Sequence, residues 1–173
     1  MADELLDLVD KDDNVIGSVW KSKAHSDSKL IHREIAFVVF NNMNQVLLQQ
    51  RSASKTNDPL SWKLTVAGHV GAGEKPQDAA LRELKEELGF TTKPIFYNKI
   101  YISQQKFNES RFFYIYYSVV KNSPKIIVDR TEVADTKWVE IGKLKEFAND
   151  NEYDINGWSH ITIIEIANKL KII

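Results

Sequence analysis

Three glutamates near the middle of this 173-residue chain are spaced so that they could bind a divalent metal ion. Glu83, Glu86 and Glu87 occupy positions i, i+3 and i+4, so a helix would gather their carboxylates within an arc of about 100°. Like charges at these spacings destabilise an isolated helix by roughly 0.2–0.5 kcal/mol per pair. Mg²⁺ and Mn²⁺ prefer oxygen ligands and would turn this repulsion into ligation. A solvated, glutamate-rich helix face is the alternative interpretation.

The residues around these glutamates predict the helix that would position them. Ala80, Leu84 and Leu88 form an apolar stripe beside the acidic face, which could pack against a sheet. Pro76 suits the first position of a helix, and Gly89 suits the position just after the last turn. The pattern therefore predicts a helix with one buried face and a carboxylate border.

The segment Gly68–Phe90 matches a known motif at every fixed position. It reads GHVGAGEKPQDAALRELKEELGF, which fits the Nudix box, G-x5-E-x7-R-E-U-x-E-E-x-G-U, where U is an apolar residue. The chain therefore resembles the Nudix family. This resemblance implies a loop–helix–loop that holds Mg²⁺ or Mn²⁺ against a diphosphate, within an α/β/α sandwich.

The resemblance also implies roles for individual residues of the box. The implied metal ligands are the three carboxylates and the carbonyl group of Gly68. The implied catalytic residues are Glu83, Glu87 and Arg82, and Arg82 would orient the Glu83 carboxylate. Glu74 would brace the loop without taking part in the chemistry.

The remaining chain predicts one domain, residues 1–173, of α/β (α+β) class with a mixed central sheet. An N-terminal hairpin is expected over about 4–21, and the Nudix box spans 68–90. Three tryptophans, Trp62, Trp138 and Trp158, are candidates for stacking on a base or for filling the core. Strands are expected at Glu4–Val9, Val15–Lys21, Ile35–Phe40, Gln45–Gln50, Trp62–Ala67, Phe96–Ser103, Arg111–Val120 and Lys137–Glu140, with further helices near Lys143–Asn149 and Ser159–Leu170.

Composition narrows the classes of partner and chemistry. A net charge of −1 gives no electrostatic indication of nucleic acid or membrane as a partner. The chain has no cysteine, which excludes disulfides, thiolate metal sites and cysteine nucleophiles. The acidic start, MADELLDLVDKDD, is not typical of a signal peptide, and no run of about 18 apolar residues is present. We expect a cytoplasmic protein, as a monomer or a homodimer.

A second resemblance extends from about Leu5 to Trp158. The segments LLDLVDKDDNVIGSVWKSKAHSDSKLIHREIAFVVF and LLQQRSASK, followed by the box, resemble the isopentenyl-diphosphate isomerase-like branch of the Nudix superfamily. Arg51 and Lys55 fall on its diphosphate-binding cations, although a surface role is the alternative for each. Three histidines, His25, His32 and His69, fall on metal ligands of those isomerases.

The chain departs from the isomerases at two positions that matter for their chemistry. Their site adds two acidic ligands two residues apart, and the best match here is Glu109-Ser110-Arg111, in which Arg111 would repel a cation. The catalytic cysteine expected just before Gly68 is Ala67. We therefore expect no tight metal site at the three histidines, and hydrolysis in place of isomerisation.

The sequence thus predicts a metal-dependent hydrolase of small diphosphates, such as a nucleoside diphosphate linked to another group. Water would attack phosphorus with the help of the bound metal. An isopentenyl-diphosphate isomerase-like enzyme and a non-catalytic ligand-binding domain are the alternatives. The leaving group is open, and so is the general base, for which the candidates are Glu83, Glu87, Glu34, Glu109 and Glu132.

Overall fold

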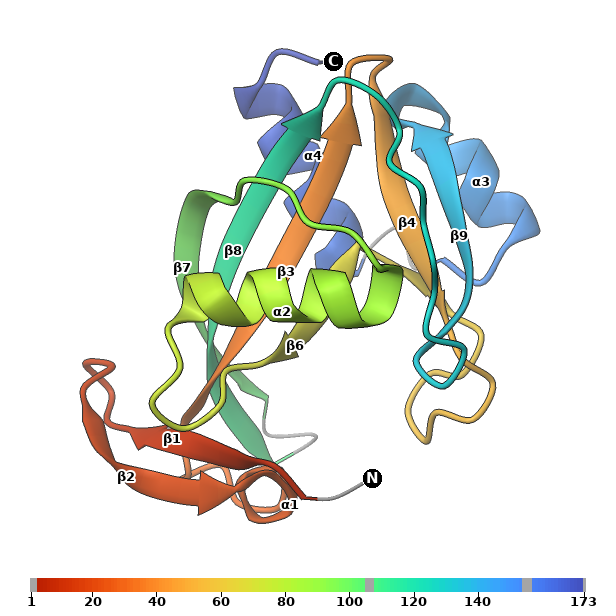
Figure 1. Ribbon diagram of the computed structural model, residues 1–173. Helices are drawn as coiled ribbons and strands as arrows, with labels where there is room; N and C mark the ends of the chain where they lie inside the picture. Colours follow the sequence, from red (N-terminus) through yellow and green to blue (C-terminus); the bar gives the residue numbers. More distant parts are fainter. Residues whose placement is uncertain (1–2, 105–107, 154–156, 173) are drawn as a thin grey trace.

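The computed structural model describes residues 3–104, 108–153 and 157–172, and its centre is a mixed β-sheet (Figure 1). The central strand β3 runs parallel to β8 and antiparallel to β4 and β6. Strand β7 pairs with β8, and both β5 and β9 pair with β4. The predicted mixed sheet is confirmed. The bounds are β3 His32–Asn41, β4 Gln45–Arg51, β5 Trp62–Lys63, β6 Val66–His69, β7 Ile95–Gln104, β8 Glu109–Val120 and β9 Val133–Glu140.

Helices cover both faces of this sheet because β3 is apolar on both sides, as a central strand must be. Ile35, Phe37 and Val39 belong to the core beneath helix α2 (Pro76–Leu88). The alternating residues Ala36, Val38 and Phe40 belong to the core beneath helix α4 (Trp158–Lys169). Helix α3 (Leu144–Asp150) follows the 3₁₀ turn η2 (Ile141–Lys143) and lies beside β9 (Figure 1). Among the described residues, no helix is long and apolar enough to cross a bilayer.

Helix α2 begins and ends where the sequence predicts. Pro76 is its first residue, and Gly89 ends it with a φ of 74°, a left-handed conformation that favours glycine. Lys75 precedes it without a side-chain capping hydrogen bond. Leu84 and Leu88 are fully buried against the sheet, so the apolar stripe fixes the side of the helix on which the glutamates lie.

The N-terminal hairpin docks on the loop of the Nudix box. It consists of β1 (Leu5–Val9) and β2 (Val15–Trp20), followed by the short helix α1 (Lys21–Ala24). The Ala72 N–H donates to the Leu5 carbonyl at 2.9 Å, and the Gly73 N–H donates to Asp7 Oδ1 at 2.9 Å. The predicted hairpin is confirmed, although Lys21 begins a helix that the sequence analysis did not predict.

Two expected strands differ from the structure. The expected strand Trp62–Ala67 is two strands, β5 and β6, because Thr65 turns the chain between β4 and β3. Its hydroxyl donates to the Leu47 carbonyl at 2.6 Å and accepts the Val39 N–H at 2.9 Å. The last strand begins at Val133 because it pairs along all of β4. The connection between the expected strands Phe96–Ser103 and Arg111–Val120 lies partly outside the described residues.

The three candidate tryptophans pack in or against the core. Trp62 is only 6% exposed and meets the Phe147 ring edge-on, with centroids 5.2 Å apart. Trp158 is partly buried, and its ring centroid lies 4.5 Å from that of Phe113. Trp138 packs partly buried on the core beneath α2. The core-filling interpretation therefore applies to all three.

Candidate functional site

Glu83 of α2 lies against strand β6 because Gly68 lets the helix approach. A β-carbon on Gly68 would lie 2.2 Å from Cδ of Glu83, which is too close for two carbon atoms that are not bonded to each other. Arg82 Nη1 donates to Glu83 Oε1 at 2.7 Å and to Glu86 Oε2 at 3.2 Å. The structure thus brings Gly68, Arg82 and Glu83 together, in the arrangement that the box implies.

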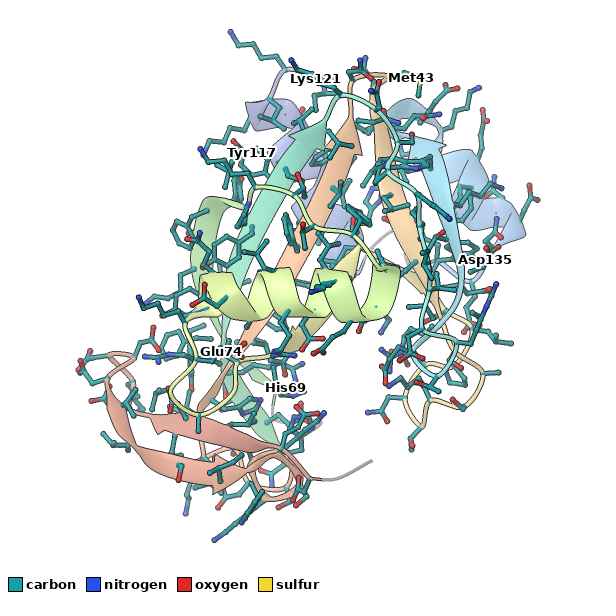
Figure 2. The ribbon with its side chains drawn as sticks, viewed as in Figure 1. Met43, His69, Glu74, Tyr117, Lys121 and Asp135 are labelled. Atoms are coloured by element: carbon teal, nitrogen blue, oxygen red, sulfur yellow. The ribbon has the colours of Figure 1, made fainter. Side chains whose placement is uncertain are left out.

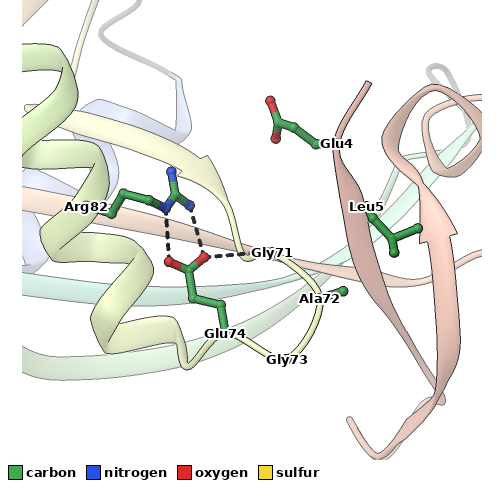
Figure 3. A pocket seen from close by; sticks show the side chains of 7 residues that line it. All are labelled: Glu4, Leu5, Gly71, Ala72, Gly73, Glu74 and Arg82. Carbon is green, nitrogen blue, oxygen red and sulfur yellow. Dashed lines mark hydrogen bonds and ion pairs between the residues drawn. The ribbon is translucent and has the colours of Figure 1, made fainter. Parts of the chain in front are cut away.

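Glu74 braces the loop through the same arginine (Figure 3). Arg82 Nε and Nη2 donate to the two carboxylate oxygens of Glu74 at 2.9 and 3.0 Å, and Nη2 also donates to the His69 carbonyl at 3.0 Å. Glu74 Oε2 accepts the Gly71 N–H at 2.9 Å. These contacts border a hollow of about 490 Å³ between the loop and the hairpin residues Glu4 and Leu5. The bidentate ion pair therefore fixes the loop relative to α2.

Glu87 carries the most perturbed carboxylate of the three. It is 8% exposed, and its Oε2 has no hydrogen-bond partner among the described residues. Burial, followed by the charge of Glu83, raises the pKa of Glu87 to about 8, while Gln49 opposes the shift. Burial also raises the pKa of Glu83, against the opposing effect of Arg82. A buried carboxylate oxygen without a donor fits a bound cation, so the residues present fit a divalent metal.

The two predicted diphosphate-binding cations lie at the end of β4. Arg51 is its last residue, and its Nε donates to the Asn57 carbonyl at 3.0 Å. Lys55 lies in the following loop and forms an ion pair with Glu132, whose side chain is 24% exposed. Lys55 and Glu132 both contribute to the electrostatic environment of Glu87. Lys55 therefore lies near the box carboxylates, whereas the contact of Arg51 is with its own loop.

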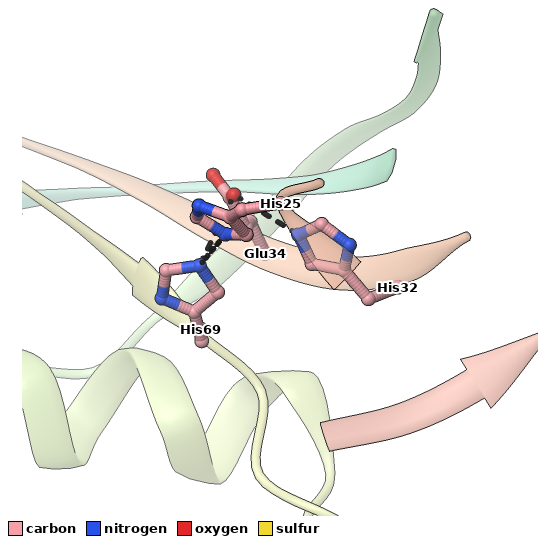
Figure 4. Close-up of side chains that lie close together, drawn as sticks. All are labelled: His25, His32, Glu34 and His69. Atoms are coloured by element: carbon pink, nitrogen blue, oxygen red, sulfur yellow. Dashed lines mark hydrogen bonds and ion pairs between the residues drawn. The ribbon is translucent and has the colours of Figure 1, made fainter. Parts of the chain in front are cut away.

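A second group of residues, His25, His32, Glu34 and His69, is called the histidine cluster below (Figure 4). His32 and Glu34 are two residues apart on β3, so they point to the same face, away from the core beneath α2. Glu34 on β3 lies opposite His69 on the neighbouring strand β6, so His69 is the third side chain on this face. His25 follows α1 and completes the cluster. Figure 2 shows His69 and Glu74 on the side of α2 that faces the hairpin.

Distances within the histidine cluster are those of a metal-ligand set. The Nε2 atoms of His25 and His69 are 2.9 Å apart, and Glu34 Oε1 lies 3.3 Å from His32 Nε2 and 3.4 Å from His69 Nε2. Ligands of a tetrahedral transition ion are about 3.3 Å apart when the metal bonds are roughly 2.0–2.2 Å. Burial, with the neighbouring histidines, lowers the pKa of His25 to about 4, so its imidazole is neutral at pH 7.

Arg111 supplies a positive charge to the same cluster. Its position opposite His32 on β8 brings Nη1 to 3.3 Å from Glu34 Oε1 and into an ion pair with Glu109. Burial opposes ionisation of Glu34, but hydrogen bonds from His32 and His69 and the charge of Arg111 hold its pKa well below the usual value. A metal ion would have to compete with Arg111 for this carboxylate. The prediction of no tight site at the histidines stays a prediction.

The sequence analysis considered Glu34 only as a general base, whereas the structure places it among the histidines. The signal was present, because His32-Arg33-Glu34 in a strand puts the first and third side chains on one face. Ala67 precedes His69 by two residues on β6 and therefore points to that face as well. The isomerase-like positions thus gather on one side of β3, and the box carboxylates come from the helix on the other.

Comparisons with known proteins agree with this fold. A model of the NUDIX domain matches residues 30–156. The chain is 35% identical to isopentenyl-diphosphate Delta-isomerase 2 of Photorhabdus laumondii, over 86% of this chain and 84% of that protein. It is 29% identical to an uncharacterized Nudix hydrolase of Nostoc sp., over 86% and 88% of the two chains.

A solved structure shares the fold at low sequence identity. A protein of Deinococcus radiodurans superimposes with a TM-score of 0.67 at 23% identity, over 86% of this chain and 91% of that one. At this identity the likeness shows the fold alone. The domain match covers well over half of the chain, and the complete box lies within it, so the chain belongs to the Nudix family.

Proposed function

We propose that this Nudix protein is a metal-dependent hydrolase of a small diphosphate, such as a nucleoside diphosphate linked to another group. The observation that supports its metal dependence most is the buried Oε2 of Glu87, which has no hydrogen-bond partner among the described residues and lies beside Glu83 in a box that keeps all three carboxylates. Glu83, Glu86, Glu87 and the Gly68 carbonyl would hold Mg²⁺ or Mn²⁺. Arg51 and Lys55 would bind the diphosphate oxygens.

When bound, the metal would neutralise diphosphate oxygens and lower the pKa of an attacking water. The protein's own residues position the reactants. Arg82 orients Glu83 through its 2.7 Å hydrogen bond, and Glu74 keeps Arg82 in place. A carboxylate must accept the proton of the water. Glu34 and Glu109 are paired with Arg111 and Glu83 with Arg82, which leaves Glu87 and Glu132 as the candidates without an arginine partner.

Isomerisation of a prenyl diphosphate is the second candidate, and the 35% identity to a named isomerase favours it. That identity speaks for the isomerase more directly than any comparison speaks for a hydrolase. Our preference for hydrolysis rests on two residues. Ala67 replaces the thiol that the isomerase resemblance requires, in a chain without any cysteine, and Arg111 replaces a metal-binding carboxylate. Both reactions share a diphosphate ligand and a divalent metal.

A panel of nucleoside diphosphate derivatives and small diphosphates, assayed with Mg²⁺ and with Mn²⁺, tests the proposal. We expect metal-dependent release of a monophosphate from at least one class. With that substrate, Arg51→Ala should raise KM by about tenfold and change kcat little, because the side chain would bind ground state and transition state alike. An Arg51→Ala enzyme with unchanged KM would remove Arg51 from the diphosphate site. No release from any member of the panel would count against hydrolysis itself.

A further inference from the structure

Lys55, the predicted diphosphate-binding lysine, is already held by a carboxylate from outside the Nudix box. Its ammonium group forms an ion pair with Glu132, and the two side chains are only 15% and 24% exposed. The pair Lys143–Glu140, near the other end of β9, is 58% and 52% exposed. Water and salt screen the buried pair less than the exposed one, so the attraction between Lys55 and Glu132 is the stronger.

Glu132 is fixed relative to helix α2 by its backbone. The Asp129 N–H donates to the Glu87 carbonyl at 2.9 Å, and the Ile127 N–H donates to the Leu88 carbonyl at 3.0 Å. Asp129 then begins a tight turn, in which its own carbonyl accepts the Glu132 N–H at 3.0 Å. The Glu132 carboxylate therefore belongs to a segment anchored on the end of the metal-binding helix.

The loop that carries Lys55 is joined to the same turn. The Ser52 N–H donates to the Glu132 carbonyl at 2.9 Å, and the Ser52 hydroxyl donates to the Arg130 carbonyl at 3.1 Å. The Ser54 hydroxyl donates to the Thr131 carbonyl at 3.3 Å. Two anchored loops thus face each other across the ion pair. The pairing is part of the fold and is not a chance meeting of two mobile side chains.

The ion pair is joined to the end of the box helix, because Glu132 ends the turn whose Asp129 N–H donates to the Glu87 carbonyl at 2.9 Å. Burial and the charge of Glu83 are the main causes of the raised pKa of Glu87, but Glu132 raises this pKa further and Lys55 lowers it. A diphosphate held at Glu87 by a metal would therefore bring its oxygens close to Lys55. One ammonium group cannot keep full contact with both the carboxylate and a phosphate.

We propose that Glu132 is a built-in competitor of the diphosphate for Lys55: the ligand binds by displacing the Glu132 carboxylate, and the ion pair re-forms when the ligand leaves. This proposal rests on the proposed function only for the class of ligand, which hydrolysis and isomerisation share. A phosphate group carries more charge than a carboxylate and can take over the lysine donors. Breaking the pair costs free energy, so Glu132 weakens ligand binding and favours release.

Calorimetric titration with methylenediphosphonate at constant Mg²⁺ tests the exchange without turnover, since its P–C–P bridge cannot be hydrolysed. The proteins compared are the wild type, Glu132→Gln, Lys55→Met and the double variant. We expect Glu132→Gln to tighten binding by about fivefold when Lys55 is present. The same change in the Lys55→Met background should have a clearly smaller effect. Glu140→Gln, which breaks the exposed pair, is the matched control and should leave the affinity unchanged.

Other outcomes overturn the proposal. Equal tightening in both backgrounds would mean that Glu132 only repels the ligand and does not compete for Lys55. Unchanged or weaker binding by Glu132→Gln, or no binding by the wild type, would also contradict it. The proposed function fails separately: coupling between Lys55 and Glu132 in a protein that hydrolyses no diphosphate would support the exchange and reject the hydrolase. An active hydrolase in which Glu132 and Lys55 show no coupling would support the proposed function and reject the exchange.

Discussion

The glutamates of α2 and the histidine cluster each have an arginine beside them, but the two arginines reach different carboxylates: Arg82 pairs with Glu83 and Glu86, whereas Arg111 pairs with the buried Glu34. Glu34 accepts contacts from His32 and His69 and from the guanidinium of Arg111. Glu87 has an oxygen without any partner among the described residues. The two sites therefore differ in what would neutralise their buried carboxylates. Glu87 would be neutralised by a proton or a metal ion, whereas Glu34 already has the charge of Arg111 beside it.

This difference explains how one fold could carry two candidate metal sites and use them differently. A buried, unpaired carboxylate is costly, and the protein can reduce that cost by binding a proton or a cation. At Glu87 Oε2, which has no hydrogen-bond partner among the described residues, a metal would compete mainly with a proton. In the histidine cluster a metal would compete with Arg111, which is held in place by both Glu34 and Glu109. This comparison supports our proposal that the catalytic metal binds at α2.

Removing one carboxylate from α2 should have the largest effect. Glu87→Gln keeps the shape of the side chain but loses a metal ligand, so we expect metal-dependent hydrolysis to fall on the order of 100-fold or more. His25→Gln in the histidine cluster should change the rate by less than about tenfold. Glu165→Gln on the exposed face of α4 is the control for losing a helix glutamate. Wild-type turnover by Glu87→Gln at saturating Mg²⁺ would show that our metal assignment is wrong.

Removing Arg111 should leave Glu34 without an arginine partner and so make the histidine cluster a better metal site. Arg111→Gln deletes the charge paired with Glu34, so we expect the affinity for Zn²⁺ to rise by about tenfold, because like charges no longer repel. Arg130→Gln is the matched control. Metal content after dialysis, measured by elemental analysis, gives the comparison. Near-stoichiometric zinc or manganese in the wild type, lost when His25 and His69 are changed, would show that Arg111 does not prevent tight metal binding at the cluster.

The two sites should give the metal-free protein opposite dependences of stability on pH. The folded-state pKa of Glu87 is about 8, above its ordinary 4.5, so its contribution to stability falls as the pH rises between these values. The folded-state pKa of His25 is about 4, below its ordinary 6.5, so its contribution rises from pH 4 to 6.5. Below pH 6.5 the two contributions to stability change in opposite directions. Above pH 6.5 only the contribution of Glu87 still changes, and it continues to fall.

Between pH 6.5 and 8 the free energy of unfolding of the wild type should therefore fall, by at most ~1.4 kcal/mol per pH unit. Urea denaturation in EDTA measures this slope. Glu87→Gln should flatten it, because the titrating group is gone, and saturating Mg²⁺ should do the same by occupying the carboxylate. An equally steep slope in the variant would mean that another group is responsible.

The sequence predicted the box site better than the histidine cluster because the first is local and the second is not. Pro76, Gly89 and the leucine stripe lie within one helix, so spacing alone located the carboxylates. The cluster depends on the register that pairs Glu34 with His69 and His32 with Arg111, across three strands. The split of 62–67 into two strands and the pairing of Lys55 with Glu132 also depend on contacts between distant segments. The spacing of residues along the chain does not indicate these contacts.

Water attack on phosphorus is the central claim, and ³¹P NMR in ¹⁸O-enriched water tests it most directly. Wild-type protein with Mg²⁺ would receive the substrate found in the panel and, separately, isopentenyl diphosphate. We predict ¹⁸O in a monophosphate product of the first reaction. We predict no dimethylallyl diphosphate from the second, even with Ala67→Cys, because Arg111 remains. Formation of dimethylallyl diphosphate by the wild type, without ¹⁸O-labelled phosphate from any substrate, would contradict the account and establish the isomerase instead.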